Sequence, residues 1–387
     1  MSPKILVSAG EPSGDLYAAG LVERLRRRLP DASFFGCAGH HMEQAGVRPV
    51  VHAASLAVVG LLEVVGHIPR IYREYRRLID AARRERPDLA ILTDSPDFNL
   101  RVARRLKTLG IPVVYLVAPQ VWAWRKGRIS SIRRNIDRLL CIFPFEESYF
   151  RHHGVPAEYI GHPLSRMVKP SVSREDFLRR HRLDGENPLI VLLPGSRRGE
   201  ITRHLPTVLD AVRGIMRRNR TAQFVLALPA GLLRHSGGGW LGSLLGDAPV
   251  TPAEGETWDA IAHADLALAA SGTVTIETAL LGTPMVTYYR VTGFSWLMGK
   301  FLVDVPFYSM VNLVAGRAVV PELMQNEMRG DRLAAEAIRL IENPAARDVM
   351  RRDLRDVAAL LSTGGDPLER AAAAVQQVLN HGDTNES

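Results

Sequence analysis

The stretch "ILVSAGEPSGDLYAAG", Ile5 to Gly20, opens with an apolar run and passes through a glycine-containing turn into a helical pattern. This order is typical of a buried parallel strand followed by a helix in an α/β domain. Turns of this kind often bind phosphate. Here Glu11 and Asp15 lie on either side of Ser13 and Gly14, and two carboxylates would repel a phosphate. The stretch therefore predicts the fold class and leaves open what this turn binds.

The same alternation of short apolar runs and helical patterns continues along the chain and restarts after a proline-containing segment, residues 161–176. We therefore predict two doubly wound, Rossmann-like α/β domains that face each other across a cleft. The expected domains are residues 1–168 and 169–355, followed by a helix in 356–387 that packs back and a disordered tail. The expected strands are Ile5–Ala9, Phe34–Cys37, Leu89–Thr93, Val113–Val117, Leu139–Phe143, Tyr159–Ile160, Leu189–Leu193, Phe224–Leu228, Ala267–Ala269 and Met285–Tyr288.

The composition is that of a soluble globular protein large enough for two hydrophobic cores. Of the 387 residues, 46% are hydrophobic and 23% are charged. Cys37 and Cys141 have no partner at metal-ligand spacing, so neither a zinc site nor a disulfide is expected, and the location should be reducing and cytoplasmic. No run of 18 or more apolar residues and no signal-peptide pattern occurs, so we expect no membrane span.

The net charge of +8 comes mainly from arginine runs. Such runs are usually solvated helix faces, and the alternatives are nucleic acid or an anionic membrane. Aromatic residues make up 6% of the chain and are not interleaved with the basic runs, which argues against nucleic acid. In Leu56–Arg77 an apolar face with Leu61, Val65 and Ile68 precedes a basic end that includes Arg73. This segment is either a core helix with a solvated end or an interfacial membrane segment.

Two strand-to-helix turns in the second half could bind an anion. One contains Gly195, Ser196 and Arg197, and the other contains Ser271-Gly272-Thr273. Each points backbone N–H groups and the positive end of a helix at one place. Glycine and serine there could also serve only to begin the helices. Two such turns in one domain, one with an arginine, favour a diphosphate, and Glu277 further along the second helix could accept hydrogen bonds from a ribose.

The first half offers a candidate base in "LTDSPDFN", Leu92 to Asn99. Asp97 either begins a helix or acts as a general base toward a sugar hydroxyl. In "APQVWAWRKGR", Ala118 to Arg128, Trp122 and Trp124 could fill a core or pack against a sugar ring or acyl chain.

A series of short motifs resembles one family, the lipid-A-disaccharide synthases, inverting glycosyltransferases of the two-Rossmann-domain GT-B type. The resemblance covers residues 9 to about 325. "SPDFN" together with "VWAWR" is highly specific, whereas "PGSR" and "SGT" also occur in other nucleotide-sugar enzymes. The motifs are "AGEPSGD" (9–15), "GLLEVVGH" (60–67), "SPDFN" (95–99), "QVWAWRKGR" (120–128), "FPFE" (143–146), "YIGHP" (159–163), "LLPGSR" (192–197), "ASGT" (270–273) and "NLVAGR" (312–317).

The resemblance implies a defined reaction. The enzyme would transfer 2,3-diacylglucosamine from its UDP derivative to 2,3-diacylglucosamine 1-phosphate, giving the β-1,6-linked lipid A disaccharide 1-phosphate and UDP with inversion. It would need no cofactor and no metal ion, so electrostatic stabilisation of the leaving diphosphate would fall to Arg197 and helix N-termini. It also implies a peripheral enzyme on the cytoplasmic face of the inner membrane, a possible homodimer, and no nucleic-acid partner.

Roles carry over by position in this sequence. Asp97 resembles the base that deprotonates the acceptor 6-hydroxyl, and we expect Glu11 to act beside it. The expected UDP contacts are Ser196, Arg197, Ser271, Gly272, Thr273 and Glu277. The expected acceptor and active-site residues are Ser13, Gly14, Asp15, Asn99, Trp122, Trp124 and Asn312. The expected membrane or acyl contacts are Leu61, Val65, Ile68 and Arg73.

Two other functions use overlapping features. A UDP-sugar epimerase or a glycosyltransferase with a soluble acceptor would share the UDP half, but would not predict the apolar-then-basic segment Leu56–Arg77. A non-catalytic lipid-binding protein would not need two turns that converge on a diphosphate. Release of UDP together with a disaccharide product distinguishes all three.

Overall fold

The computed structural model describes residues 2–56, 61–123, 126–236, 239–291 and 305–383, with only the backbone described for 61–67, 126, 235–236 and 381–383. The chain forms two compact units. Unit 1 comprises Met1–Pro163 with Leu361–Ser387, and unit 2 comprises Leu164–Leu360. Each unit is built on its own parallel sheet.

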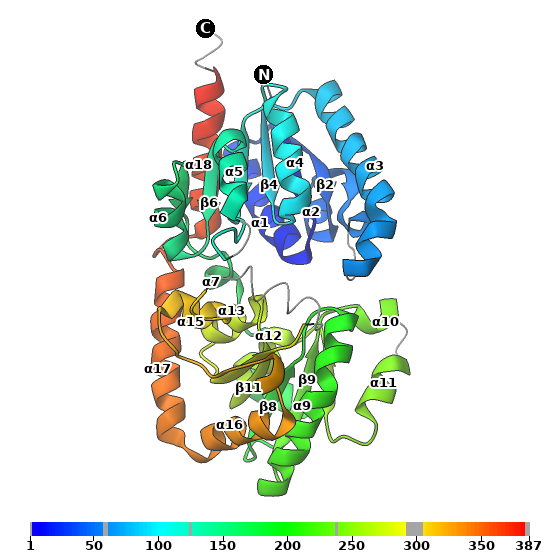
Figure 1. Cartoon of the computed structure of the whole chain (residues 1–387), viewed down its shortest axis with the longest axis vertical. Coiled ribbons are helices and arrows are strands. Elements are labelled where there is room, and N and C mark those ends of the chain that lie inside the picture. The colour runs from blue at the N-terminus through cyan, green and yellow to red at the C-terminus, as the bar shows by residue number, and fades with distance from the viewer. Residues whose placement is uncertain (1, 57–60, 124–125, 237–238, 292–304, 384–387) are drawn as a thin grey trace. The chain divides into compact units, whose positions relative to one another are not determined.

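Unit 1 contains a seven-stranded sheet in the order β3-β2-β1-β4-β5-β6-β7 (Figure 1). Every pairing is parallel, and β1 lies inside the sheet, with Val7 opposite Gly36 of β2 and Ile91 of β4. The strands are β1 Lys4–Ala9, β2 Ser33–Ala38, β3 Arg48–His52, β4 Leu89–Thr93, β5 Val113–Leu116, β6 Arg138–Cys141 and β7 Ala157–Tyr159.

Helices cover both faces of this sheet. Helices α3, α4 and α5 pack side by side, and α1 packs against α2 and α18. Arg24 of α1 donates a 2.9 Å hydrogen bond to Asp366, which immediately precedes α18, so the start of α18 is fixed to α1. The helices are α1 Pro12–Arg28, α2 His40–Gln44, α3 Leu61–Glu85, α4 Pro96–Lys107, α5 Ile129–Asn135, α6 Pro144–His152 and α18 Pro367–Asp383, with 3₁₀ helices η1 Ala53–Ser55 and η2 Lys126–Arg128.

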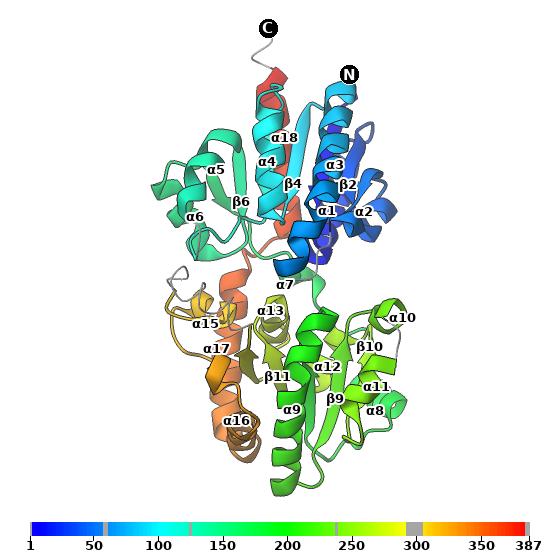
Figure 2. The same cartoon turned by 45° about the vertical axis from the view of Figure 1, so that its right-hand side comes forward.

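Unit 2 contains a six-stranded parallel sheet in the order β10-β9-β8-β11-β12-β13 (Figure 2). Its strands are β8 Leu189–Leu193, β9 Gln223–Leu228, β10 Thr251–Glu254, β11 Leu266–Ala270, β12 Met285–Tyr289 and β13 Glu322–Met324. Its helices are α7 Leu164–Met167, α8 Arg174–His181, α9 Arg198–Arg218, α10 Leu232–Ser236, α11 Gly239–Leu245, α12 Thr257–His263, α13 Thr273–Leu280, α15 Met310–Ala315, α16 Gly330–Glu342 and α17 Pro344–Leu361, with the 3₁₀ helix η3 Gln325–Glu327.

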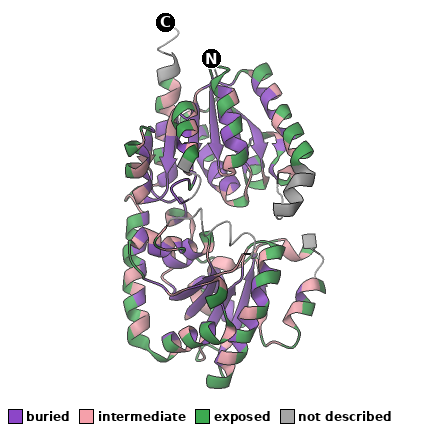
Figure 3. Cartoon of the chain, in the orientation of Figure 1, coloured by how far each residue is buried: buried purple, intermediate pink, exposed green. Residues whose placement is uncertain are grey.

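The predicted fold class of two doubly wound units with C-terminal helices is confirmed. The central strands were predicted correctly because they are apolar on both faces, and Figure 3 shows them buried beneath more exposed helices. Sequence reasoning missed β3, β10 and β13, which all lie at sheet edges. Among the described residues, no helix has both the length and the apolar character needed to cross a bilayer.

Candidate active site

In unit 1, the turn between β1 and α1 binds a carboxylate of the protein itself. The backbone N–H groups of Gly10 and Glu11 donate hydrogen bonds of 2.8 and 3.1 Å to the two carboxylate oxygens of Asp94. Asp94 directly follows β4, the strand beside β1. Pro12, the first residue of α1, has no N–H to offer. An internal anion thus occupies the place where a phosphate would bind.

The glycines of this turn permit the close approach. A Cβ on Gly14 would overlap the Asp94 carboxylate, and a Cβ on Gly10 would overlap the Ser95 hydroxyl. Asp94 and Ser95 also have left-handed backbones, with φ values of 50° and 39°. Such conformations cost about 1–3 kcal/mol each outside glycine and persist only where neighbouring groups hold them. Here Tyr115 donates a 2.6 Å hydrogen bond to the Asp94 carbonyl.

Two of the predicted acceptor contacts use their polar atoms inside the fold. Asn99 is fully buried and donates to the Thr93 carbonyl at 2.7 Å, while its oxygen accepts from the Ser8 hydroxyl at 2.8 Å. The two oxygens of Asp15 accept from the N–H groups of Gly39 and His41 at the start of α2. These hydrogen bonds fix the loops around Asn99 and Asp15, and the contact of either residue with a substrate stays a prediction.

Asp97 presents its carboxylate to solvent. It lies in the first turn of α4, its side chain is 66% exposed, and it forms an ion pair with Arg128 at the end of η2. Glu11 and Ser13 are half-buried. Burial raises the pKa of Tyr115 well above its usual value, and Asp94, Arg128, Glu11 and Asp97 also act on that pKa. Asp97 and Glu11, the two carboxylates predicted to be catalytic, thus both act electrostatically on this one buried phenol.

Asp94 adds a titratable group to this cluster. Its pKa is raised from 3.8 to about 7, mainly by burial and also by the nearby Glu11 carboxylate, although hydrogen bonds with Gly10, Ser95 and the Glu11 N–H act to lower it. The group can therefore gain or lose a proton near neutral pH.

Trp122 belongs to a buried cluster beside this edge. Its indole N–H donates to Glu146 at 3.1 Å, and its ring meets Phe145 edge to face at 4.9 Å between centroids. Glu146 is fully buried, and burial raises its pKa to about 7. Its other oxygen accepts from the Phe143 N–H at the start of α6. Trp122 thus supports this helix start, and Trp124 lies outside the described residues.

In unit 2, the two predicted diphosphate turns leave neighbouring strands but differ in structure. In the first, Glu200 of α9 accepts hydrogen bonds from the N–H groups of Ser196 and Arg197 at 3.1 and 3.3 Å. Gly195 has a φ of 132°, and a Cβ there would crowd the Glu200 side chain. The helix thus carries its own acid at its start. The Arg197 side chain is 53% exposed and lies 3.8 Å from Glu200.

The second turn leaves the N–H groups of Gly272 and Thr273 open. Ser271 is fixed by an N–H hydrogen bond to the Tyr288 carbonyl and a hydroxyl hydrogen bond to the Tyr308 carbonyl, at 2.8 and 3.1 Å. Among the described residues, no group accepts a hydrogen bond from the backbone N–H of Gly272 or Thr273, and both residues are exposed. The two turns thus differ, because the first has its N–H groups paired with Glu200 and the second keeps two N–H groups without an acceptor in the described part of the chain.

Glu277 lies one helical turn beyond Thr273. Burial raises its pKa to about 7, while a hydrogen bond with the Trp258 side chain acts to lower it. Asn312 of α15 is buried and fully engaged. Its oxygen accepts from the N–H groups of Val319 and Val320, and its amide donates to the Val320 carbonyl and to Glu322. Asn312 therefore holds together the segment between α15 and β13.

Residues 61–77 of the predicted membrane segment lie in α3. Ile68 is 53% exposed and Arg73 is also exposed. The side chains of Leu61 and Val65 lie outside the described residues. Exposed Tyr72 stacks on Tyr75 with 6.2 Å between ring centroids, which extends this surface along the helix.

Sequence reasoning missed the residues that act on the predicted ones. Arg128 was inside a quoted motif but had no assigned role, and Glu200 was not singled out although it follows Arg197 by three residues, the spacing of a capping acid. The pairing of Asp94 with Gly10 spans 84 residues, and no local pattern reveals it.

Comparisons with known proteins show the family to which the chain belongs. The family model described as "Lipid-A-disaccharide synthetase" matches residues 5–374. Lipid-A-disaccharide synthase of Solibacter usitatus is 60% identical over 97% of this chain and 98% of its own length. The enzyme of that name from Koribacter versatilis is 42% identical, over 98% of this chain and 100% of its own length.

Solved structures with little sequence identity share the fold. The UDP-GlcNAc 2-epimerase of Neisseria meningitidis aligns with a TM-score of 0.65 and 12% identity over 98% of this chain and 100% of its own. The calicheamicin glycosyltransferase CalG4 aligns with a TM-score of 0.59 and 16% identity, covering 98% of both chains. Together with the sequence matches, these findings show that the chain belongs to the lipid-A-disaccharide synthase family, glycosyltransferases of lipid A biosynthesis with the GT-B fold.

Proposed function

We propose that the chain transfers 2,3-diacylglucosamine from UDP-2,3-diacylglucosamine to 2,3-diacylglucosamine 1-phosphate, with inversion at the transferred sugar. Family membership supports the activity. The observation that carries the residue assignment is Asp97, an exposed carboxylate in the first turn of α4 and ion-paired to Arg128.

Unit 1 serves the acceptor in this proposal. Asp97 takes the proton of the acceptor 6-hydroxyl as the oxygen forms its bond to C1 of the donor sugar. Glu11 and Ser13 orient the acceptor from the adjacent helix start, where both are half-exposed. Arg128 positions the Asp97 carboxylate until the acceptor hydroxyl replaces that contact.

Unit 2 serves the donor. As the acceptor oxygen attacks C1, the bond from C1 to the diphosphate breaks and its electron pair leaves with UDP. The open N–H groups of Gly272 and Thr273, together with the exposed guanidinium of Arg197, stabilise the charge that develops on the diphosphate. Glu277 accepts hydrogen bonds from the ribose hydroxyls. Ser196 and Ser271 contribute hydroxyl groups at the two turns.

The decisive experiment incubates the purified chain with both lipid substrates in detergent and measures UDP and disaccharide together. The Asp97→Ala variant should lose a factor of about 10²–10⁴ in turnover while its calorimetric affinity for UDP stays unchanged. Asp31→Asn, an exposed acid elsewhere in unit 1, is the matched control and should behave as wild type. Release of UDP without formation of disaccharide would refute the proposed reaction. Loss of UDP binding in Asp97→Ala would refute the assignment of Asp97 to the acceptor.

We also propose that α3 docks on the anionic cytoplasmic face of the inner membrane. Exposed Ile68 and Tyr72 suit the interface, and Arg73 suits headgroup phosphates. Ile68→Asp should reduce pelleting with phosphatidylglycerol vesicles, whereas Leu109→Asp, at an exposed apolar residue after α4, should not. Equal pelleting of both variants would contradict the proposal. The family resemblance further suggests a homodimer, which sedimentation velocity tests directly.

A further inference from the structure

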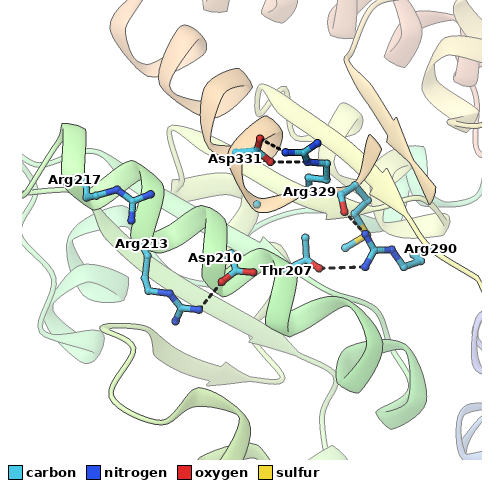
Figure 4. A pocket seen from close by; sticks show the side chains of 9 residues that line it. Thr207, Asp210, Arg213, Arg217, Arg290, Arg329 and Asp331 are labelled. Atoms are coloured by element: carbon cyan, nitrogen blue, oxygen red, sulfur yellow. Dashed lines mark hydrogen bonds and ion pairs between the residues drawn. The ribbon is translucent and has the colours of Figure 1, made fainter. Parts of the chain in front are cut away.

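A polar pocket of about 460 Å³ lies in unit 2 between α9 and the start of α16 (Figure 4). Its volume is in the range of small-molecule sites. Arg290, the residue after β12, closes one side. None of the lining residues belongs to the predicted donor turns. They are Thr207, Asp210, Arg213, Arg217, Arg290, Met328, Arg329, Gly330 and Asp331.

Positive charge exceeds negative charge in this pocket. Its lining contains four arginines and two aspartates. Asp210 accepts a 2.6 Å hydrogen bond from Arg213, and Asp331 accepts two, of 3.0 and 2.8 Å, from Arg329. Both aspartates are therefore already paired. Within the described parts of the chain, no acidic side chain forms an ion pair with Arg217 or Arg290.

Arg290 is held in place by neutral oxygens. Its guanidinium donates to the Gln325 carbonyl at 3.3 Å, to the Thr207 hydroxyl at 3.5 Å, and to the Met328 carbonyl. These contacts fix its direction but do not neutralise its charge. A half-buried cation without a counter-ion is costly, and an anionic ligand removes that cost.

The chemistry of the walls limits what can bind. Met328 is the one apolar side chain among the lining residues and is fully buried, so the pocket offers little to an acyl chain. Arginine presents forked donors that match phosphate oxygens. We propose that this pocket binds a phosphate group, carried either by a soluble phosphate compound or by a lipid headgroup. The proposal does not depend on the assignment of the donor turns.

The test uses the full chain with saturating UDP, so that the proposed donor site is occupied. One arm titrates inorganic pyrophosphate by calorimetry, and the other measures pelleting with phosphatidylglycerol vesicles against phosphatidylcholine vesicles. Arg217→Gln should weaken binding about tenfold in at least one arm, either to pyrophosphate or to phosphatidylglycerol vesicles, because it removes one charge-assisted contact. Arg220→Gln, an exposed arginine outside the pocket, is the matched control and should change binding less than twofold.

Arg290→Lys tests the second cation. The lysine keeps the charge and loses the fork, so binding should again weaken while the fold is kept. A dependence on Arg217 in the pyrophosphate arm identifies a soluble ligand, and a dependence in the vesicle arm alone identifies a headgroup. The proposal is overturned if Arg217→Gln and Arg220→Gln behave alike in both arms, or if wild type binds neither probe.

Discussion

The start of α1 in unit 1 and the start of α13 in unit 2 follow the same plan of strand, small-residue turn and helix, yet one is filled and the other is open. At α1, the N–H groups of Gly10 and Glu11 already bind the Asp94 carboxylate. At α13, no described group accepts from the N–H of Gly272 or Thr273. The comparison teaches that a helix start predicts where an anion can bind, but not whether the protein supplies that anion itself.

The neighbouring strand decides the difference. The strands beside β1 are β2 and β4, and the residues after them are Gly39 and Asp94. The strands beside β11 are β8 and β12, and the residues after them are Pro194 and Arg290. The residue after a neighbouring strand therefore supplies a carboxylate at the start of α1. At the start of α13, the residues after the neighbouring strands supply none. The acidity of the Ile5–Gly20 stretch is consistent with this, because a turn that never binds phosphate can tolerate Glu11.

The largest expected effect comes from filling the open start. Thr273→Asp places a carboxylate beside the N–H groups of Gly272 and Thr273, as Asp94 does at α1. UDP affinity should fall at least about a hundredfold, because the carboxylate both competes for the N–H groups and repels the diphosphate. Thermal stability should stay equal or rise, since an acid at a helix start stabilises it by about 0.3–1 kcal/mol.

Calorimetry with UDP and a melting curve measure both effects in the same variant. Thr273→Asn has almost the same shape without the charge and should lose far less affinity. Equal affinity for UDP in wild type and Thr273→Asp would mean that the start of α13 is not part of the donor site.

The second effect comes from removing the Asp94 carboxylate from the start of α1. Asp94→Ala leaves the N–H groups of Gly10 and Glu11 without their acceptor, which should cost about 2 kcal/mol locally. Hydrogen exchange of these two amides should therefore accelerate about thirtyfold. Asp97→Ala, three residues further along, is the matched control and should leave their exchange unchanged. Slow exchange in Asp94→Ala would mean that other groups hold the turn.

The comparison also shows what the sequence could predict. The central strands and the helix starts were predicted because their signals are local, namely apolar runs of five or so residues followed by Gly, Ser or Pro. The edge strands β3, β10 and β13 were missed because segments such as "RPVVH" and "TPAE" have polar residues or proline where a central strand is apolar.

The predicted roles of Asp15, Asn99 and Asn312 show a different limit. Each is a polar residue at a loop with the right chemistry for a sugar contact. In the structure, Asp15 accepts from the N–H of Gly39, Asn99 donates to the Thr93 carbonyl, and Asn312 accepts from the N–H of Val319. Which partner satisfies a polar side chain depends on tertiary packing, and one sequence carries no signal for that choice.

A third, smaller effect concerns Glu277, which is half-buried like Asp94. Asp94 and Glu277 both have a pKa raised to about 7, with burial as the main cause. If ribose hydroxyls donate to Glu277, they favour its ionised form, so UDP affinity should rise as the pH rises through 7. Between pH 6 and 8 the gain should approach tenfold, following the ionised fraction of this one group.

Calorimetry at several pH values measures this gain. The phosphate groups of UDP also titrate, so Glu277→Gln is measured in parallel, and the ratio of the two affinities isolates the glutamate. A ratio that does not change with pH would contradict the ribose contact.

The smallest expected effect concerns α9, whose start lies between the two extremes because its acid, Glu200, comes from the same helix. Glu200→Gln keeps an oxygen for the N–H groups of Ser196 and Arg197 but removes the negative charge 3.8 Å from the Arg197 guanidinium. If Arg197 binds the diphosphate, UDP affinity should rise about threefold at low salt, the size of an exposed ion pair. The gain should disappear at high salt because screening weakens exposed charges.

Glu186→Gln, at an exposed acid before β8, is the control and should leave UDP affinity unchanged. A loss of affinity in Glu200→Gln would instead mean that the carboxylate positions Arg197. The start of α9 would then contribute to UDP binding only when its acid is present.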